Sequence, residues 1–504
     1  MTESTAVNLR TSERSVIADE LLAKYPASRA VDATQLAEIT SKSGVVLVVI
    51  DDDPTGSQSV VDIPVLTAWE TEDFAWAFKQ GSPLVFVLTN SRSVDMVTAA
   101  ERNGAAVVNA TNAAKSGGHR LIFLSRSDST LRGHFPQETD AIERASLQAG
   151  GAAIDGVLLV PAFPSAGRVT VGGVHFLREG DLLVPVAQTQ FAKDASFGYQ
   201  HSDLREYVEE KTAGRVVAED VIVIDLATIR TSADAIAELV SPATDGRVLV
   251  ADCVTDDDMR ALCVGLALAE SRGKVFLYRT GPAFVGARVG QARPEPLDVD
   301  SVLADAEERE HGGLIVVGSH VDLTNRQLGA LRAARPDILD IEVDAQRLDL
   351  DGDPTEATVS YLGSIVDTIT VGLRSNDVIL RTSRSIRTGG TAEESLQIAR
   401  AVSAGVSAIV HAIVTDVRPR FVVAKGGITS NDTASEGLEI RRGTIRGPLL
   451  NGLVSLWQSA AGLARGIPYV VFPGNVGDDD ALLTVVSKLS LRQPATTSPT
   501  KDIK

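Results

Sequence analysis

The sequence predicts an α/β protein of two domains, each with a largely parallel sheet covered by helices. Short runs of branched apolar residues alternate with helical patterns from residue 44 onward, as is typical of parallel strands buried on both faces. One polar segment interrupts this series. The chain also has 504 residues, of which 44% are hydrophobic, which is more than a single core usually serves.

The first domain is expected over residues 44–295, after an N-terminal extension over residues 1–43. Within the extension, Ile17, Leu21 and Leu22 recur at helical spacing and predict a short amphipathic helix around residues 16–25. The strands of the first domain are predicted over residues 45–50, 84–88, 121–124, 157–160, 221–224 and 248–251.

A polar stretch that carries prolines and then acidic residues separates the two domains. We interpret residues 296–311 as a linker and residues 312–491 as the second domain. Its strands are predicted over residues 314–317, 340–343, 378–382, 421–424 and 469–472. The tail over residues 492–504 is rich in Thr, Ser, Pro and Lys, so we expect it to be disordered.

The composition argues against several classes of function. A formal net charge of −18 disfavours nonspecific contact with nucleic acid or anionic lipid. Cys253 and Cys263 lack the spacing of a disulfide framework or a zinc site. The N-terminal residues lack the apolar core of a secretory signal, and no uninterrupted apolar stretch is long enough to span a bilayer. We therefore expect a cytoplasmic protein with neither nucleic acid nor membrane as a partner.

Three adjacent aspartates, Asp51, Asp52 and Asp53, follow the first predicted strand. Ligands of open parallel sheets bind beyond the carboxyl ends of strands. Three neighbouring carboxylates repel one another, so a cation or a substrate hydroxyl is expected to offset them. The alternative is a solvated turn in which Asp53, Thr55 or Ser57 caps a helix. The motif alone leaves both readings open.

Arginine-bearing loops follow three further predicted strands. Such loops supply fixed cations and hydroxyls that suit a carboxylate or phosphate, although Arg–Asp pairs that staple a loop would give the same pattern. Their recurrence at one expected edge of the sheet favours a binding pocket. The candidate side chains are Arg92, Arg126, Asp128, Ser129, Arg132 and Arg168.

Glycine-bearing loops follow three strands of the second domain, within residues 316–327, 424–432 and 470–482. Free backbone N–H groups at such turns can receive phosphate oxygens, and glycine allows a close approach. No GxxxxGK[ST] motif is present, and strand-to-helix turns use glycine in any case. The candidate nucleotide-binding residues are Ser319, Lys425, Gly426, Gly427, Ile428, Thr429, Gly474 and Asn475.

Six motifs in one order resemble the four-carbon acid sugar kinases: DDDPTG, SRSDSTLRGHFPQE, PAFPSAGRVTVGG, GSH-x-x-x-T-x-x-Q, AKGGITS and PGNVGDDDAL. The resemblance runs from about Gly44 to Leu491. It implies an ATP-dependent kinase that phosphorylates a tetronate such as threonate, erythronate or 3-oxo-tetronate. It further implies an acid-binding first domain, a nucleotide-binding second domain and an active site at the cleft between them.

The resemblance also suggests roles for the candidate residues. Asp52 and Asp53 match the family's paired aspartates, with Asp128 as the reserve for orienting the acceptor hydroxyl. The arginines and Ser129 would bind the substrate. Mg²⁺ would be held largely by nucleotide oxygens and water, so no protein ligand is assigned to it. Asp51 stands where alanine is usual and Arg126 where lysine is usual, and the role of Asp51 is unexplained.

Two rival functions remain open at this point. Residues 51–55 fit the DxDxT opening of haloacid-dehalogenase-type phosphatases, in which Asp51 would be the nucleophile. A sugar-acid sensor that has lost catalysis would keep the same loops. The oligomeric state is also open, with a homodimer as one alternative.

Overall fold

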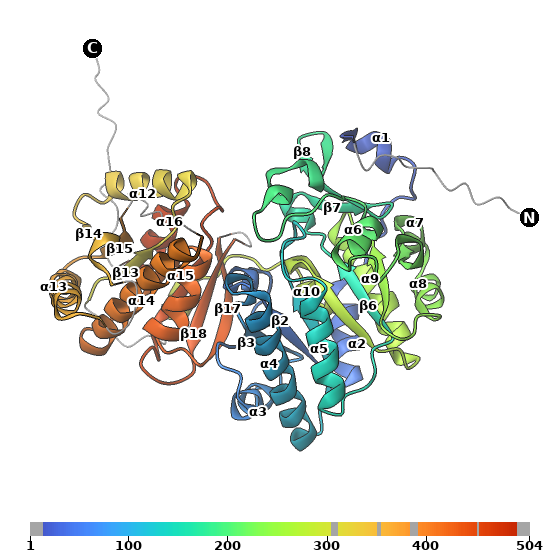
Figure 1. The fold of residues 1–504 in the computed structure, drawn as a ribbon, viewed down its shortest axis with the longest axis horizontal. Helices are drawn as coiled ribbons and strands as arrows, with labels where there is room; N and C mark the ends of the chain where they lie inside the picture. The colour runs from blue at the N-terminus through green and yellow to red at the C-terminus, as the bar shows by residue number, and fades with distance from the viewer. Residues whose placement is uncertain (1–13, 304–310, 350–353, 384–391, 451–452, 491–504) are drawn as a thin grey trace, which may run out of the picture. The chain divides into compact units, whose positions relative to one another are not determined.

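The computed structural model describes residues 14–303, 311–349, 354–383, 392–450 and 453–490 and divides the chain into two compact units. Unit 1 ends at Arg293, and unit 2 begins at Pro294. In each unit a largely parallel sheet is covered by helices, so the predicted fold class is confirmed (Figure 1). The expected disordered tail, 492–504, and residues 304–310 of the expected linker lie outside the described residues.

The main sheet of unit 1 is built from the branched apolar runs. Within the unit its order is β10-β11-β6-β12-β5-β2-β4-β3, and the neighbouring strands pair in parallel. Their carboxyl ends therefore meet at one edge. The strands are β2 (Val45–Asp51), β3 (Ile63–Leu66), β4 (Leu84–Leu88), β5 (Arg120–Arg126), β6 (Gly156–Val160), β10 (Ile222–Ile224), β11 (Arg247–Ala251) and β12 (Phe276–Thr280).

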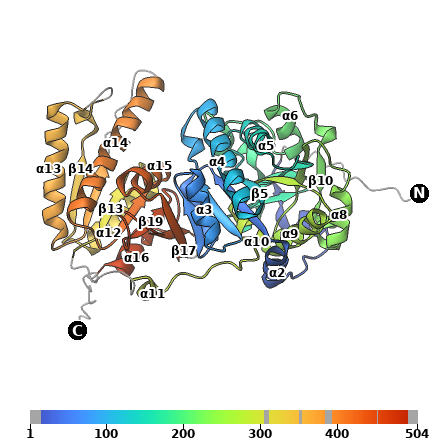
Figure 2. The same cartoon turned by 90° about the horizontal axis from the view of Figure 1, so that it is seen from below.

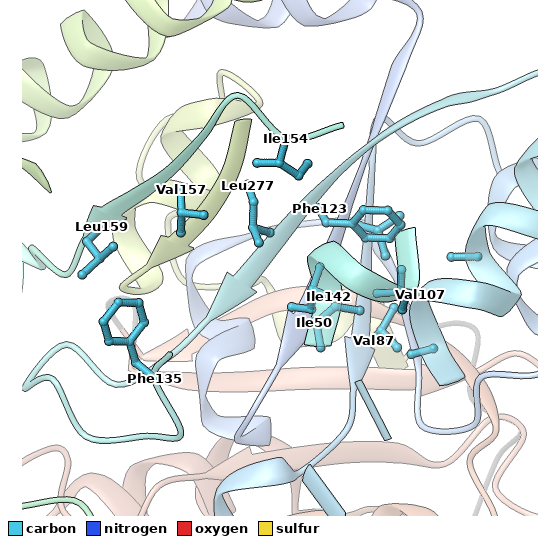
Figure 3. Close-up of a cluster of buried hydrophobic side chains, with 14 of the residues drawn as sticks. Ile50, Val87, Val107, Phe123, Phe135, Ile142, Ile154, Val157, Leu159 and Leu277 are labelled. Atoms are coloured by element: carbon cyan, nitrogen blue, oxygen red, sulfur yellow. The ribbon is translucent and has the colours of Figure 1, made fainter. Parts of the chain in front are cut away.

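Helices cover both faces of this sheet (Figure 2). One group comprises α3 (Thr71–Lys79), α4 (Met96–Gly117) and α5 (Gln137–Gln148). The other comprises α2 (Ala33–Ser43), α7 (Leu226–Thr231), α8 (Ala233–Val240), α9 (Asp256–Ser271) and α10 (Pro282–Arg288). Phe123, Ile142 and Leu277 lie in the core under the first group (Figure 3). Burial of such side chains stabilises the unit by roughly 1.5–3 kcal/mol each.

A small antiparallel sheet, β1-β9-β8-β7, belongs to the same unit. It consists of β1 (Val16–Ile17), β7 (Arg168–Val171), β8 (Val174–Glu179) and β9 (Leu182–Pro185). The helix expected around residues 16–25 is shorter than predicted, because Val16 and Ile17 pair with β9 and only α1 (Ala18–Leu22) is helical. Helix α2 was not predicted. It packs on α9 and α10 and helps make the described part of residues 1–43 a component of unit 1.

Unit 2 has its own sheet, ordered β17-β18-β19-β16-β13-β15-β14 within the unit. Strands β19 to β14 pair in parallel, whereas β17, β18 and β19 pair antiparallel. The strands are β13 (Leu314–Val317), β14 (Leu339–Val343), β15 (Val378–Thr382), β16 (Val422–Lys425), β17 (Arg442–Leu450), β18 (Val454–Ser459) and β19 (Pro468–Phe472). The helices are α11 (Val299–Leu303), α12 (Asp322–Ala334), α13 (Glu356–Leu373), α14 (Ala392–Asp416), α15 (Gly427–Asp432) and α16 (Ala481–Leu489).

Helix α14 corrects one statement of the sequence analysis. Its segment Gln397–Asp416 is long and apolar enough, by composition alone, to cross a membrane. Core helices of soluble domains pass the same test. Ile409, Val410 and Ile413 of α14 are fully buried, and the helix packs against α13 and α15. These contacts account for its apolar character within unit 2.

Candidate functional site

The three aspartates lie at the carboxyl end of β2 and have different surroundings. Asp51 is the last residue of the strand, and its side chain is buried. Asp53 caps the short helix over Pro54–Ser59, where its Oδ1 accepts hydrogen bonds from the Thr55 N–H at 2.8 Å and the Thr55 hydroxyl at 2.6 Å. The capping alternative is therefore correct for Asp53. It does not exclude a second role, because its Oδ2 is 3.4 Å from Nη1 of Arg92.

Arg92 neutralises Asp52 directly. It lies on the turn Ser91–Ser93 after β4, and its Nε and Nη2 donate to the two carboxylate oxygens of Asp52 at 3.0 and 2.5 Å. Burial raises the Asp52 pKa above its usual value although Arg92 opposes it. Burial acts on Asp53 in the same direction, but Arg92, Arg126 and the bonds from Thr55 outweigh it and lower the Asp53 pKa. Asp53 is therefore ionised at neutral pH.

Arg126, at the end of β5, lies beneath the aspartates. Its side chain is 3% exposed, and its Nη2 is 2.7 Å from Oδ1 of Asp51 and donates to the Asp53 carbonyl at 2.5 Å. A Cβ built on Gly56 would lie within 2.1 Å of this guanidinium, so only glycine fits there. Arg126 is thus committed to holding the acidic turn in place, and direct contact with a substrate stays a prediction.

The loop after β5 carries a second acidic group, Asp128. Nε of Arg132 donates to Oδ2 of Asp128 at 2.7 Å, and the Thr130 hydroxyl donates to the same oxygen. Burial raises the Asp128 pKa, but the charges of Arg92 and Arg132 and the bonds from Arg132 and Thr130 lower it to about 2. Asp128 is therefore ionised. The structure brings it into one electrostatic cluster with Arg92, Asp52 and Asp53.

Buried side chains hold the backbone of the loop that carries Asp128. The phenol groups of Tyr199 and Tyr207 donate to the carbonyls of Thr130 and Leu131 at 2.8 and 2.9 Å. Nε2 of His175 contacts the Ser129 carbonyl at 2.8 Å. Three buried partners hold the loop rigidly, as a preorganised binding site requires.

Two arginines flank one aromatic ring near this loop. Cζ of Arg132 is 5.3 Å and Cζ of Arg168 is 5.9 Å from the ring centroid of Phe191. Both guanidinium groups are partly buried, and burial lowers the Arg168 pKa from its usual value. Nε of Arg168 has no hydrogen-bond partner among the described residues. Two neighbouring cations with an unused buried donor form a suitable anchor for an anion.

Arg279 and Glu138 belong to the site but were missed in the sequence. Nε of Arg279, at the end of β12, donates to Oε1 of Glu138 at 2.5 Å, and the Ser127 hydroxyl donates to that oxygen at 3.1 Å. A Cβ on Gly133 would lie 3.3 Å from Nη2 of Arg279 and 3.6 Å from Oδ2 of Asp52. The Arg279–Glu138 pair therefore lies close to the Asp52 carboxylate. The apolar run over residues 276–280, which ends in Arg-Thr before Gly-Pro, was the available signal.

In unit 2 the three glycine loops meet. They follow β13, β16 and β19, which are adjacent parallel strands. A Cβ on Gly318 would lie 2.1 Å from Oγ1 of Thr429, and one on Gly474 would lie 2.6 Å from Oγ of Ser319. Gly426 has a φ of +122°, which side chains rarely adopt. The structure thus brings Ser319, Gly426, Thr429 and Gly474 together, and we call this arrangement the glycine cradle. The side chains of Ser319 and Thr429 lie against its glycines. The N–H groups of Gly318 and Ser319 donate to the Lys425 carbonyl at 3.3 Å, and that of Gly426 donates to the Phe472 carbonyl at 2.9 Å, so these three amides already have partners.

Side chains of α12 hold the third loop against the first. The Thr324 hydroxyl lies 3.0 Å from both Oγ of Ser319 and the Gly474 carbonyl. Nε2 of Gln327 donates to the carbonyls of Val476 and Asp478 at 3.0 and 2.7 Å. Gly427, Ile428 and Asn475 border the same loops, and the Ile428 side chain is exposed.

Lys425, one of the candidate nucleotide-binding residues, is the last residue of β16, and its side chain points into the interior of unit 2. Its side chain is fully buried, with Nζ 3.0 Å from the Pro473 carbonyl and 3.8 Å from the ring centroid of Phe472. Burial lowers its pKa to about 7. In this structure Lys425 therefore supports the turn before Gly474.

Within the described ranges, no cluster of three or more His, Cys, Asp or Glu side chains is arranged to hold a metal ion. A magnesium ion that arrives with a nucleotide takes most of its ligands from phosphates and water, so it needs no such cluster.

Comparison with known proteins identifies both halves of the chain. Residues 47–288 match a family model described as a sugar-binding N-terminal domain, and residues 314–482 match one described as a nucleotide-binding C-terminal domain. The chain belongs to the four-carbon acid sugar kinase family. The predicted resemblance is therefore confirmed, and the carboxylate–arginine cluster lies in the family's sugar-binding domain and the glycine cradle in its nucleotide-binding domain.

One relative and two solved structures illustrate this membership. A D-erythronate kinase of Heliobacterium modesticaldum (strain ATCC 51547 / Ice1) is 27% identical over 296 residues, which span 57% of this chain and only 60% of that protein. A Salmonella typhimurium LT2 protein, provisionally named a tRNA synthase, superposes with a TM-score of 0.63 at 18% identity and covers 89% of this chain and 100% of its own. A Haemophilus influenzae protein gives 0.57 at 17% identity, over 87% and 98%. These two structures show the fold alone.

The site geometry argues against the phosphatase alternative. A nucleophilic aspartate must be exposed to a phosphate ester, but the Asp51 side chain is buried and paired with Arg126. Membership in a family of sugar-acid kinases argues in the same direction.

Proposed function

We propose that the protein is an ATP-dependent kinase that transfers the γ-phosphoryl group to a hydroxyl of a small sugar acid. Four-carbon acids such as threonate, erythronate and 3-oxo-tetronate are the proposed class. The observation that carries the proposal is the cluster of ionised aspartates and arginines at the carboxyl edge of the unit 1 sheet, in a chain whose other unit bears a glycine cradle. The name of the Heliobacterium relative supports the same substrate class.

The acid would be anchored by its carboxylate. Arg132 and Arg168 flank Phe191 and supply two guanidinium groups at one place. A guanidinium can bind a carboxylate through two parallel hydrogen bonds. Ser129 lies on the same rigid loop and would contact a substrate hydroxyl.

Asp53 is our choice for the carboxylate that orients the acceptor hydroxyl. Its Oδ1 accepts the two hydrogen bonds of the helix cap, whereas its Oδ2 lies 3.4 Å from Nη1 of Arg92. The two carboxylate oxygens of Asp52 accept hydrogen bonds from Nε and Nη2 of Arg92, and Oδ2 of Asp128 accepts one from Nε of Arg132. A carboxylate with a low pKa is a weak base. Phosphoryl transfer, however, depends mainly on positioning and charge stabilisation, so orientation of the hydroxyl suffices.

The glycine cradle of unit 2 would receive the nucleotide. A Cβ at Gly318, Gly426 or Gly474 would press on the side chain of Thr429 or Ser319, so the three loops lie close together. Turns of this kind between a strand and a helix can bind phosphate. Mg²⁺ would enter with ATP and neutralise the charge of the β- and γ-phosphates. Transfer requires that the acid and the nucleotide meet, and an active site between the domains stays a prediction.

A coupled assay of ADP release tests this function. The protein should be screened with ATP and Mg²⁺ against C4 to C6 aldonates and oxo-acids, and we expect ADP release to be fastest with a four-carbon acid. Release of phosphate from sugar phosphates without ATP would instead support a phosphatase. Calorimetric binding of an acid without any ADP release would support a sensor. Either result would overturn the proposal.

A further inference from the structure

A cavity of about 200 Å³ opens at the other end of the unit 1 sheet. It lies among the ends of α4 and α5, the start of β5 and the segment that leads into β12. Arg120 lines it, whereas Arg126 at the opposite end of β5 belongs to the acidic cluster. At about 3.3 Å per residue, the strand separates the two places by roughly 20 Å. The cavity is therefore distinct from the proposed sugar-acid site.

The inner wall of the cavity is largely apolar, although Thr111 and Ser146 also line it. Phe123 and Ile154 are buried residues of the unit 1 core that also line it (Figure 3). Phe276 and Ala114 extend the same apolar wall. An apolar cavity of about 150 Å³ in another protein accommodates benzene, so the present one has room for a ring-sized body and a small polar group.

Its rim is basic. Lys115, His119 and Arg120 line the cavity, and the lining contains no Asp or Glu among the described residues. The rim therefore carries basic side chains although the whole chain has a formal net charge of −18. The ammonium group of Lys115 donates to the Ala149 carbonyl, which uses one of its three donors. The remaining donors are available at the rim for an anion.

The apolar wall and the basic rim together indicate which kind of ligand the cavity can bind. An apolar wall attracts a hydrocarbon body, and a basic rim without acids favours one negative charge at its end. We infer that this cavity is a second binding site of the protein, for a small carboxylic acid with an apolar, ring-sized body. Such a ligand differs from a sugar acid, whose hydroxyls would be left unpaired against Phe123, Ile154 and Phe276.

Calorimetric titration of the full chain tests the site, with benzoate as the probe. We expect saturable binding of benzoate, and about tenfold weaker binding of benzyl alcohol, which lacks the charge, and of acetate, which lacks the ring. Absence of saturable benzoate binding, or equal affinity for benzyl alcohol, would overturn the inference.

Substitutions locate the binding. Ala152 lines the cavity in an exposed loop, and the neighbouring Ala153 is exposed but does not line it. Ala152→Leu should block the mouth and weaken benzoate binding at least tenfold, and Lys115→Met should weaken it about tenfold by removing the charge. Ala153→Leu is the matched control and should bind as the native chain does. Arg168→Ala should also leave benzoate binding unchanged. A loss in Arg168→Ala, or none in Ala152→Leu, would place benzoate elsewhere and refute the site.

Discussion

At the scale of single residues, the unexplained Asp51 acquires a role. Its buried carboxyl group pairs with Arg126, and together they anchor the turn that presents Asp52 and Asp53. Burial raises the Asp51 pKa to about 7, although Arg126 opposes this shift. The sequence departs from the resembled family at both positions, with Asp51 in place of alanine and Arg126 in place of lysine. The ion pair connects these two departures, because a guanidinium buried at this place requires a nearby carboxylate.

Asp51→Asn should therefore destabilise unit 1. Breaking a buried ion pair typically costs about 3–5 kcal/mol, and this is the upper value expected here because Asp52 stays 3.7 Å from Arg126. Denaturation by urea, followed by circular dichroism, measures the loss in the free energy of unfolding. Glu38→Gln is the matched control, because it breaks an exposed pair with Lys42 and should leave stability essentially unchanged. A stability equal to the native value in Asp51→Asn would contradict the assigned role.

Asp53→Asn should stop turnover but not folding. Asparagine is as good a helix cap as aspartate, so the turn after β2 should persist. Loss of the charge at Oδ2 should lower kcat by about a thousandfold while ATP binding is retained. Steady-state kinetics and calorimetry measure the two effects. Asp32→Asn changes a similar cap at the start of α2 and should have full activity. A near-normal rate in Asp53→Asn would reject its assignment.

Lys425 should make the stability of unit 2 depend on alkaline pH. Its pKa is about 7 in the folded chain, against about 10.4 when unfolded. Between these values the unfolded state binds the extra proton, so this contribution to stability rises as pH increases from 7 to 10 and is lost as pH falls through 7. The slope is at most about 1.4 kcal/mol per pH unit. Lys425→Met should remove it, as urea denaturation across this pH range would measure. Equal slopes in the two proteins would contradict the prediction.

At the scale of elements, the sequence predicted most strands with branched apolar runs and missed the small antiparallel sheet, β17 and β18, and also β3 and β12 although both are fully buried. β2, β4 and β13 are uninterrupted branched apolar runs, which few other structures produce. The short antiparallel strands β7 to β9 carry exposed and charged residues, and β17 contains Gly447 and Pro448 at register shifts. Tertiary pairing rather than local pattern determines such strands.

Local sequence pattern likewise revealed some residues of the candidate site and missed others. Residues such as Arg92 and Asp128 could be found because they directly follow predicted strands. The pairing of Arg279 with Glu138 joins positions 141 apart in the chain, and no local pattern reveals it. The burial of Lys425 was equally hidden, because a lysine after a strand can point to solvent or fold back on its own turn.

The convergence of the glycine loops yields a prediction about elements. Gly318→Ala would place a methyl group 2.1 Å from Oγ1 of Thr429 and 3.3 Å from its Cβ, so the Thr429 side chain or the loop after β13 must shift. We expect the KM for ATP to rise at least tenfold while the KM for the acid is unchanged, because the acid site lies in unit 1. Gly329→Ala on α12 meets no atom within 4 Å and serves as the control. It should keep native kinetics and gain up to about 1 kcal/mol of stability. A native KM for ATP in Gly318→Ala would contradict the cradle.

At the scale of the whole molecule, the local charges at the proposed sites differ from the net charge of the chain. A chain with a net charge of −18 repels anions, yet both proposed substrates are anions. Unit 1 offsets this by gathering Arg92, Arg132 and Arg168 near one edge of its sheet. In the proposed function unit 2 relies instead on its glycine loops. Because the N–H groups of Gly318, Ser319 and Gly426 donate to the carbonyls of Lys425 and Phe472, other amides of these loops would receive the phosphate. The two units thus use different means to hold their anions.

This division predicts where each ligand protects the chain. A ligand that binds the native state slows local opening around its site, so amide hydrogen exchange reports its position. A nonhydrolysable ATP analogue with Mg²⁺ should slow exchange most at residues 316–321, 425–430 and 473–478. Threonate should do so at residues 51–59, 89–94 and 127–133. Mass spectrometry of peptic peptides measures both patterns.

Erythritol, which has the same carbon number but lacks the carboxylate, should protect neither set, because Arg132 and Arg168 require an anion. Protection of unit 1 by erythritol would contradict the carboxylate anchor, and protection of unit 2 by threonate alone would contradict the assignment of the two sites.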